Sequence, residues 1–305
     1  KKNSLEDVRA YLEEMGSPDR GMKIIHVAGT NGKGSVCSYL TSMLTETGYK
    51  VGTFISPHLE EIRERFLMNG DLVREDTYER AFYRVKELSE KMVEKGYQPP
   101  TYFEFLFYMC MAVNEQCKPD FVILETGLGG RLDVTNVVEH PVLTVITSIS
   151  MDHMSFLGNT LGEIAEKKAG IIKPGCRVVT TKQKPEAAQV IADTCKKLHV
   201  PCVVSEPDEA VLEKESVFGQ TFSYKGEEFA ISLAGVYQKE NAVLALNALE
   251  ELDRLGWRTR CWLLRHLKFW MSWDGILPWN SERMDFPIQA GREDLRLSIK
   301  SLFLS

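Results

Sequence analysis

The sequence predicts an α/β protein whose core is a P-loop-containing, mostly parallel sheet flanked by helices. Over residues 1–255, short runs rich in β-branched residues alternate with longer helical stretches, which is the pattern of βαβ units. A glycine-rich stretch at 29–35 follows the first expected strand and precedes a helix, as phosphate-binding loops do. With 305 residues, of which 44% are hydrophobic, the chain has room for two domains at ~100–200 residues each.

The first part of the chain alternates helices and strands around the glycine-rich stretch. Strands are expected in the short apolar runs and helices in the longer stretches between them. The helices are expected at 5–15, 35–47, 75–95 and 102–117, and the strands at 23–28, 51–56, 121–125 and 142–147. The polar segment 57–70 has the length of a lid or an Ω-loop.

The second part continues this alternation up to Gly256. A helix is expected at 161–170, a strand at 177–181, a helix at 185–198, a strand at 201–205 and a helix at 239–255. The runs 221–224 and 228–233 meet across Lys225-Gly226, which favours a β-hairpin. Beyond Gly256 all five tryptophans lie between 257 and 279. Neither the strand period of 2 residues nor the helix period of 3.6 residues continues for long after Leu267. We therefore place a boundary at 256.

Charge and hydropathy argue against several classes of partner. The net charge of −6 is spread in mixed sign, without a basic stripe that could follow a nucleic-acid backbone. The longest apolar runs are far shorter than the ~18–20 residues of a membrane span, and the first residues contain no apolar signal segment. The seven cysteines form no Cys-x-x-Cys pair, which argues against disulfides and a zinc site. We expect a cytoplasmic protein that binds neither nucleic acid nor a membrane.

The stretch 29–35, called the phosphate loop below, has the residues expected of a nucleotide site. Backbone N–H groups at a helix N-terminus favour phosphate, and Lys33 adds a mobile positive charge for the β- and γ-phosphates. In the common spelling a Ser or Thr follows the lysine directly, whereas here Gly34 intervenes. A glycine-rich turn with a solvated lysine is the alternative, but the strand before and the helix after favour nucleotide binding. The candidate residues are Thr30, Asn31, Gly32, Lys33, Gly34 and Ser35.

Two further candidates follow from their places at strand ends. Ser56 ends a strand at the edge where α/β proteins bind ligands, so its hydroxyl can ligate Mg²⁺ beside the phosphates, or simply form a turn. Glu125 ends a buried apolar run, where a carboxylate is costly unless it is paired or metal-bound. By contrast, a lone His153 is more often structural, and Lys168 belongs by composition to a solvated helix face.

The phosphate loop and four further stretches together resemble the folylpolyglutamate synthase/dihydrofolate synthase branch of the Mur ligase superfamily. The stretches are Ser56-Pro57-His58-Leu59 with Glu64-Arg65 and Asn69-Gly70; Glu125 to Asp133 with Thr135-Asn136; Asp152-His153 with Leu157-Gly158, Glu163-Ile164-Ala165 and 168–175; and Gln238 to Ala242. They occur in the family's order over roughly 22–250, which makes the resemblance highly specific. It implies a sheet of the Mur ligase central-domain type.

The resemblance also implies a set of site residues. It implies ATP bound by the phosphate loop and Asn241, and two Mg²⁺ ions held by Ser56, Glu125, His153 and Lys168, of which Lys168 is carbamylated. Lys33, Lys168 and His153 take the catalytic roles. The folate or dihydropteroate is held by Pro57, His58, Leu59, Arg65, Phe103, Arg131 and Asp133, although core packing is the commoner fate of an aromatic residue such as Phe103.

The implied reaction joins L-glutamate to the carboxylate of a folate or dihydropteroate, through an acyl phosphate made with ATP, in a monomer. The family's C-terminal Rossmann-like domain contains Trp-Pro-Gly-Arg and Asp-Gly-Ala-His-Asn stretches that do not occur here. We therefore expect an ATP-binding domain at 1–256 and an aberrant or truncated remnant at 257–305, through truncation or a frame shift. A catalytically impaired nucleotide or folate binder, a cell-wall peptide ligase and a plain P-loop ATPase are the alternatives.

Overall fold

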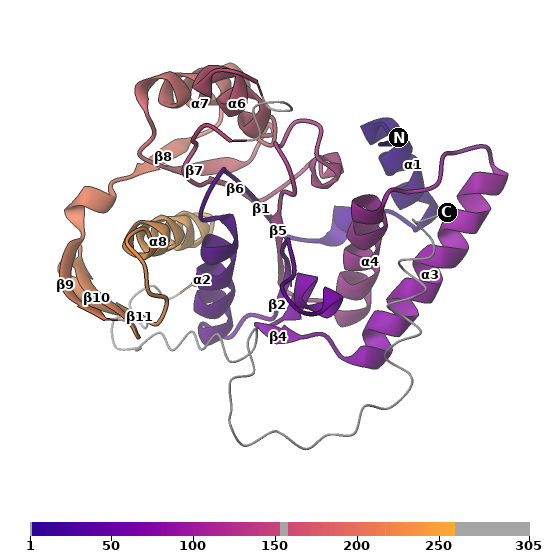
Figure 1. Ribbon diagram of the computed structural model, residues 1–305, viewed down its shortest axis with the longest axis horizontal. Helices are drawn as coiled ribbons and strands as arrows, with labels where there is room; N and C mark the ends of the chain where they lie inside the picture. Colours follow the sequence, from indigo (N-terminus) through magenta and orange to yellow (C-terminus); the bar gives the residue numbers. More distant parts are fainter. Residues whose placement is uncertain (1, 153–157, 217, 260–305) are drawn as a thin grey trace.

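An eight-stranded sheet forms the centre of the molecule (Figure 1). The computed structural model describes residues 2–152, 158–216 and 218–259. The strand order is β4-β3-β2-β5-β1-β6-β7-β8, and all strands from β2 to β8 in this order are parallel. The strands are β1 (Ile24–Ala28), β2 (Val51–Phe54), β3 (Phe66–Met68), β4 (Asp71–Leu72), β5 (Phe121–Glu125), β6 (Leu143–Ile146), β7 (Arg177–Thr181) and β8 (Cys202–Ser205). This confirms the predicted mostly parallel sheet.

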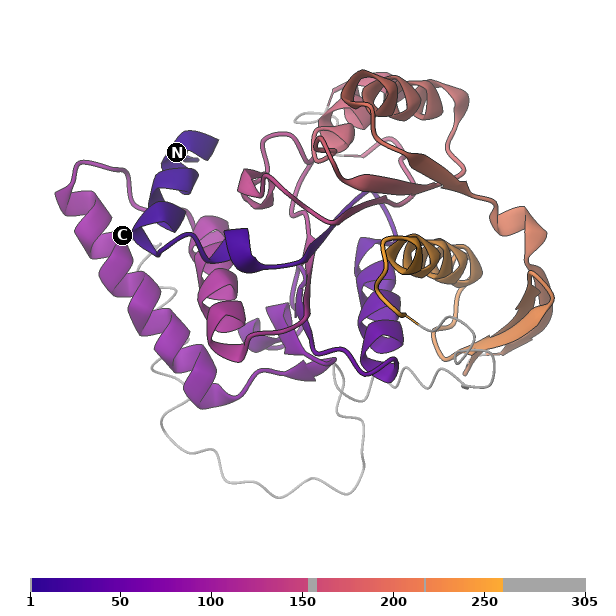
Figure 2. The same ribbon diagram turned by 180° about the vertical axis from the view of Figure 1, so that it is seen from behind.

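Helices cover both faces of the sheet, because successive strand residues point to opposite sides. Ile24 of β1 and Leu124 of β5 pack on one side with α1 (Leu5–Glu14), α3 (Glu75–Glu94) and α4 (Tyr102–Cys117). On the same side, Ile146 and Val178 pack against α6 (Leu161–Ala169) and α7 (Pro185–Leu198). Figures 1 and 2 show these helices on the side of the sheet opposite to α2 and α8.

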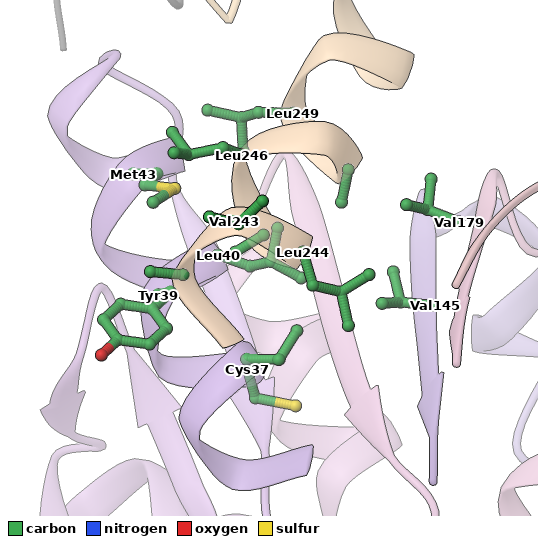
Figure 3. Packing of buried hydrophobic residues seen from close by; sticks show 14 of the residues in the cluster. Cys37, Tyr39, Leu40, Met43, Val145, Val179, Val243, Leu244, Leu246 and Leu249 are labelled. Atoms are coloured by element: carbon green, nitrogen blue, oxygen red, sulfur yellow. The ribbon is translucent and has the colours of Figure 1, made fainter. Parts of the chain in front are cut away.

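The other face carries α2 (Lys33–Glu46) and α8 (Gln238–Arg254), which pack against each other and against the sheet. Figure 3 shows Leu40 and Met43 of α2 and Val243 and Leu246 of α8 in one cluster with Val145 and Val179 of the sheet. A second, three-stranded antiparallel sheet covers this cluster. Its strands are β9 (Val211–Ser216), β10 (Gly219–Tyr224) and β11 (Glu227–Ile231).

Short one-turn helices complete the described elements. They are η1 (Pro18–Gly21), η2 (Ile62–Arg65), η3 (Val134–Val137) and η4 (Pro207–Glu209). No helix in the described part of the chain is long and apolar enough to cross a membrane.

At the edge strands one expectation is wrong, and the expected hairpin, confirmed as β10 and β11, is incomplete. The segment 57–70 is not wholly a loop, since it contains η2 and β3, and β3 pairs antiparallel with β2. Asn69 and Gly70, both with positive φ, make the tight turn from β3 to β4. The expected hairpin has a third strand, β9, whose six residues are all exposed, so hydropathy gave no signal for it.

The expected boundary at 256 falls close to the end of the described residues. Trp257 packs edge-on against Phe121 at a centroid distance of 5.5 Å, and the Thr259 hydroxyl donates to the Leu249 carbonyl at 3.2 Å. Both residues thus contact the same body as α8. Residues 260–305, on which the predicted remnant falls, lie outside the described residues.

Candidate functional site

The phosphate loop joins β1 to α2 at the carboxyl edge of the sheet. Gly32 is the N-cap of α2 with φ of +84°, and among the described residues no side chain caps this helix. A Cβ at Gly32 would also overlap the side chain of Asn241 on α8, so glycine is needed here. The first N–H groups of α2 lack intrahelical acceptors and lie at the positive end of its dipole. This terminus is therefore suited to an anion.

The segment after β6 holds the loop in place. The Thr30 N–H donates to the Ser148 carbonyl at 2.8 Å, and its hydroxyl donates to the Ser150 carbonyl at 3.2 Å. The Thr147 hydroxyl donates to the Asn31 carbonyl at 2.7 Å, and the Asn31 amide donates to Ser150 Oγ at 3.2 Å. Thr30 and Asn31 thus shape the loop through their own side chains.

Lys33 lies between the loop and the end of β5. Its Nζ donates to the Thr30 carbonyl at 3.2 Å and lies 4.0 Å from Glu125 Oε1. The helix α2 begins at Lys33, two residues earlier than expected, so Gly34 and Ser35 lie in its first turn. The loop lysine is therefore placed between a buried carboxylate and the free helix terminus.

Glu125 and Ser56 meet at the ends of two neighbouring parallel strands. Glu125 is 3% exposed, and its Oε2 accepts from the Ser56 N–H at 2.9 Å. Burial raises the pKa of Glu125 to about 7, although the Ser56 N–H and the positive charge of Lys33 oppose the rise. One carboxylate, a neighbouring hydroxyl and room for phosphate oxygens and water form the oxygen donor set that suits Mg²⁺.

Lys168 reaches the same place from α6. It is 3% exposed, and its Nζ donates to the Gly29 carbonyl at 2.6 Å. Burial and the charge of Lys33 lower the pKa of Lys168 to about 8, against the opposing effect of Asp152. The close approach of Gly130, whose Cβ would lie 2.6 Å from the Lys167 carbonyl oxygen, allows this packing. Lys168 is thus buried at the site, contrary to the solvated helix face that composition indicates.

A cavity of about 530 Å³ extends from Lys33, Ser56 and Lys168 to Arg65 and Phe103. Of the residues expected at the site, it is lined by Thr30, Lys33, Ser56, Pro57, Arg65, Phe103, Asp133 and Lys168. Arg65 is 7% exposed, and its Nε donates to His58 Nδ1 at 2.8 Å, so His58 orients the guanidinium. The Phe103 ring packs against Phe54 at 5.8 Å while lining the cavity.

The remaining expected residues of the acceptor and metal sites differ in their position relative to the cavity. Leu59 is 62% exposed, and Arg131 Nη1 pairs with Glu166 on α6 at 3.1 Å; within the described part of the chain, neither lines the cavity. Asp133 accepts from the N–H groups of Leu128 and Thr135, both at 3.0 Å, so its carboxylate shapes the cavity wall. His153 lies outside the described residues.

Several further residues at the site were not among the expected site residues. Asp152 lines the cavity and is adjacent to the predicted His153. Glu104 lines it too and caps α4 with Thr101, a pairing that the Thr-x-x-Glu spacing signals. Gln238 donates to Ser35 Oγ at 3.3 Å, so the start of α8 contacts the phosphate loop. Lys2 gave no signal, since its contact with the Leu132 carbonyl depends on tertiary structure.

The described residues do not by themselves form a complete metal centre. Among them, no three His, Cys, Asp or Glu side chains are grouped so as to hold a metal ion. Mg²⁺ is usually held by one or two carboxylates together with phosphate oxygens and water. The pairing of Glu125 with Ser56 beside a free helix terminus fits that form of binding.

Comparison with known proteins connects this geometry to a family. Residues 27–249 match the model of the Mur ligase middle domain. The chain is 42% identical over 261 residues to the dihydrofolate synthase/folylpolyglutamate synthase of Bacillus subtilis, covering 83% of this chain and 60% of that protein.

Solved structures agree with this match. The folylpolyglutamate synthase of Thermotoga maritima is 32% identical with a TM-score of 0.74, over 82% of this chain and 59% of the other. A complex of FPGS with AMPPCP and folate is 28% identical with a TM-score of 0.78, over 86% of this chain and 65% of the other. The chain spans less than two thirds of the length of each of these proteins.

Proposed function

The chain belongs to the Mur ligase family, and we propose that it is the ATP-binding part of a ligase that joins L-glutamate to a folate or dihydropteroate carboxylate. One observation carries this proposal. The cavity that Lys33 and Lys168 line at the phosphate loop is also lined by Arg65 and Phe103, so a single space reaches from the anion site to an aromatic and cationic wall. A nucleotide and an aromatic carboxylic acid can meet there. The solved FPGS complex that contains AMPPCP and folate supports this pairing.

At the nucleotide end, the first N–H groups of α2 and Lys33 hold the β- and γ-phosphates. Thr30, Asn31, Gly32, Gly34 and Ser35 of the loop also bind the nucleotide, together with Asn241, which lies beside Gly32 at the start of α8. Glu125 and Ser56 would hold one Mg²⁺, and Lys168 with His153 would hold a second. Bound there, Mg²⁺ neutralises charge on the phosphate oxygens.

Lys168 serves this purpose as a carbamate. A pKa of about 8 leaves a useful fraction of its amine neutral near pH 7. The neutral nitrogen attacks the carbon of CO₂ and loses a proton, which converts a buried cation into an anionic oxygen ligand. The geometric support is the 3% exposure of Lys168 beside the Gly29 carbonyl, within the same cavity as Lys33.

At the acceptor end, Phe103 and Pro57 pack on the ring system, and Arg65, oriented by His58, holds the carboxylate side. Asp133 shapes the wall, and Leu59 and Arg131 contact the acceptor from outside the described cavity lining. An acceptor carboxylate oxygen attacks the γ-phosphorus, which gives an acyl phosphate and ADP. The glutamate amino group then attacks the acyl carbon, and collapse of the tetrahedral intermediate releases phosphate and leaves an amide. Positioning and charge stabilisation supply the catalysis, without a protein nucleophile.

Incorporation of labelled glutamate onto dihydropteroate or tetrahydrofolate tests the proposal. We expect ATP-dependent product, and a loss of about 10²–10³-fold in rate for Lys33→Ala, because a preorganised cation is removed from the transferring phosphoryl group. Lys196→Ala, on the exposed side of α7, is the control and should keep the wild-type rate. Binding of AMPPCP and folate without any product would instead favour the nucleotide or folate binder. ATP hydrolysis that ignores the acceptor would favour a plain ATPase.

A further inference from the structure

A buried chain of hydrogen bonds runs from the middle of β1 to the wall of the cavity. His26 is 0% exposed, and its Nε2 lies 2.9 Å from the Thr135 hydroxyl. That hydroxyl donates to Asp133 Oδ1 at 2.7 Å. Asp133 Oδ2 in turn accepts from the Leu128 N–H at 3.0 Å. We call His26, Thr135 and Asp133 the relay.

The chemistry of the relay fixes its protons. The Thr135 hydroxyl donates its single proton to Asp133 Oδ1, so toward His26 it can only accept. Because burial lowers the pKa of His26 to about 3, the ring is neutral and carries its proton on Nε2. Its Nδ1 is then a buried acceptor for which no described residue supplies a donor. Such an atom costs stability, so packing alone does not explain a histidine here.

The far end of the relay is the segment 127–133, which follows Glu125 in the chain and packs against Lys167 and Lys168. Leu128 lines the cavity together with the glycines on either side of it. Two residues further, the Gly130 carbonyl accepts from the Asp133 N–H at 2.9 Å, and the Arg131 N–H donates to the Lys167 carbonyl at 2.6 Å. Asp133 Oδ1 also accepts from the Thr135 N–H at 3.0 Å, so loss of the hydroxyl bond would loosen the Asp133 side chain and weaken its hold on the Leu128 N–H and this wall.

We propose that His26 is a positioning residue that orients Asp133 through Thr135 and thereby fixes the 127–133 wall against which the acceptor binds. The inference rests on the proposed function in that the acceptor occupies this cavity. His26 touches neither substrate. Its task is to supply one N–H donor at a buried place, and any residue that supplies this donor should serve.

The test compares His26→Leu, which keeps an apolar volume and removes the donor, with His26→Gln, which retains an N–H donor. Hydrogen exchange of the 127–133 amides, affinity for folate and affinity for AMPPCP are measured on the full chain. For His26→Leu we expect about tenfold faster exchange and about tenfold weaker folate binding, as after loss of a hydrogen bond to a charged network. AMPPCP affinity should change less than twofold, and His26→Gln should remain near wild type. Thr135→Val should match His26→Leu, and the double variant should be no worse than either single one.

Three results would overturn the inference: unchanged exchange at 127–133 in His26→Leu, an equal loss in His26→Gln, or an equal loss of AMPPCP and folate affinity. If the wild-type chain binds no folate, the proposed function fails, while the exchange data still decide whether His26 fixes the wall. Thermal melting of each variant controls for global unfolding.

Discussion

Burial sets the protonation of three side chains around the cavity. Burial raises the pKa of Glu125 to about 7, and it lowers the pKa of Lys168 to about 8 and of His26 to about 3. In each residue, burial favours the neutral form more strongly than in the free side chain. Ionisable groups gathered in this way are typical of functional sites and cost the folded state stability.

The buried His26 makes stability depend on pH in acid. Between its folded pKa of about 3 and its ordinary value of 6.5, the unfolded chain binds a proton that the folded chain does not. The free energy of unfolding is therefore highest with respect to His26 above pH 6.5. Below this pH it falls by about 1.4 kcal/mol per pH unit. Between about pH 4.5 and 6, the free energy of unfolding measured with urea should change less with pH for His26→Leu than for wild type. His140→Gln, at an exposed position, should leave the slope unchanged, and parallel curves for His26→Leu would contradict the assignment.

Glu125 makes stability depend on pH in the opposite direction. Its folded pKa of about 7 exceeds the ordinary value of 4.5, so the folded chain binds the extra proton and stability falls as the pH rises through this window. At pH 8 in the presence of a chelator, Glu125→Gln should therefore stabilise the protein by about 1–3 kcal/mol, since it removes a buried charge. The same change should weaken Mg-dependent AMPPCP binding. A less stable Glu125→Gln protein at pH 8 would show that Lys33 offsets the burial of the carboxylate fully.

At the scale of elements, the phosphate loop depends on the packing of α2 against α8. Gln238 and Asn241, at the start of α8, contact Ser35 and Gly32 from a place more than 200 residues later in the chain. The apolar cluster in Figure 3 packs α2 against α8 and so keeps these residues in contact. The helix terminus is thus built by tertiary packing as well as by its own sequence.

Two glycines of the loop should differ sharply on substitution. Gly32→Ala forces a side chain into a positive φ and into Asn241, so we expect a loss of about 1–3 kcal/mol in stability and much weaker AMPPCP binding. Gly34 lies in α2, where an added Cβ would meet only Glu125 Oε2, at 4.0 Å. Gly34→Ala should therefore keep or slightly raise the stability of the ligand-free protein. Thermal melts of both variants check this, and equal losses would contradict the role of Gly32 as N-cap.

Long elements could be predicted from the sequence, and short edge elements could not. The helices Glu75–Glu94 and Tyr102–Cys117 end within a residue of the expected bounds, because the first has a long periodic apolar face and the second is a long, almost continuous apolar run. The strands Phe66–Met68 and Val211–Ser216 are too short or too exposed to give a periodic signal, and pairing with a neighbour defines them.

The candidate site divides in the same way. Residues inside a motif, such as Lys33, Ser56 and Glu125, could be identified from sequence. Lys33 and Ser56 line the cavity, and Glu125 contacts both of them. Lys168 required the family pattern, because its burial results from the packing of α6 against the phosphate loop. The link from His26 to Asp133 could not be seen in sequence, since it joins residues 109 positions apart at its first step.

At the scale of the whole molecule, the cavity draws on segments from 2 to 168, and α8 supports it from behind. The phosphate loop contacts the segment after β6 through Thr30, α6 through Lys168 and α8 through Gly32. The loop therefore contacts elements on both faces of the sheet. Unfolding of any one part should remove the site.

Nucleotide binding should consequently stabilise the whole chain in one transition. A ligand that binds only the folded state adds about 2.7 kcal/mol at a concentration of 100 Kd. For a folded body of this size, each kcal/mol raises Tm by about 2–4 °C, so saturating Mg-AMPPCP should raise Tm by roughly 5–10 °C. Calorimetry should show a single peak that moves as a unit, and Lys33→Ala should abolish the shift at the same ligand concentration. Two peaks of which only one moves would mean that the α2–α8 side and the α6–α7 side unfold separately, and the buried contact between Lys168 and Gly29 would then be too weak to join them.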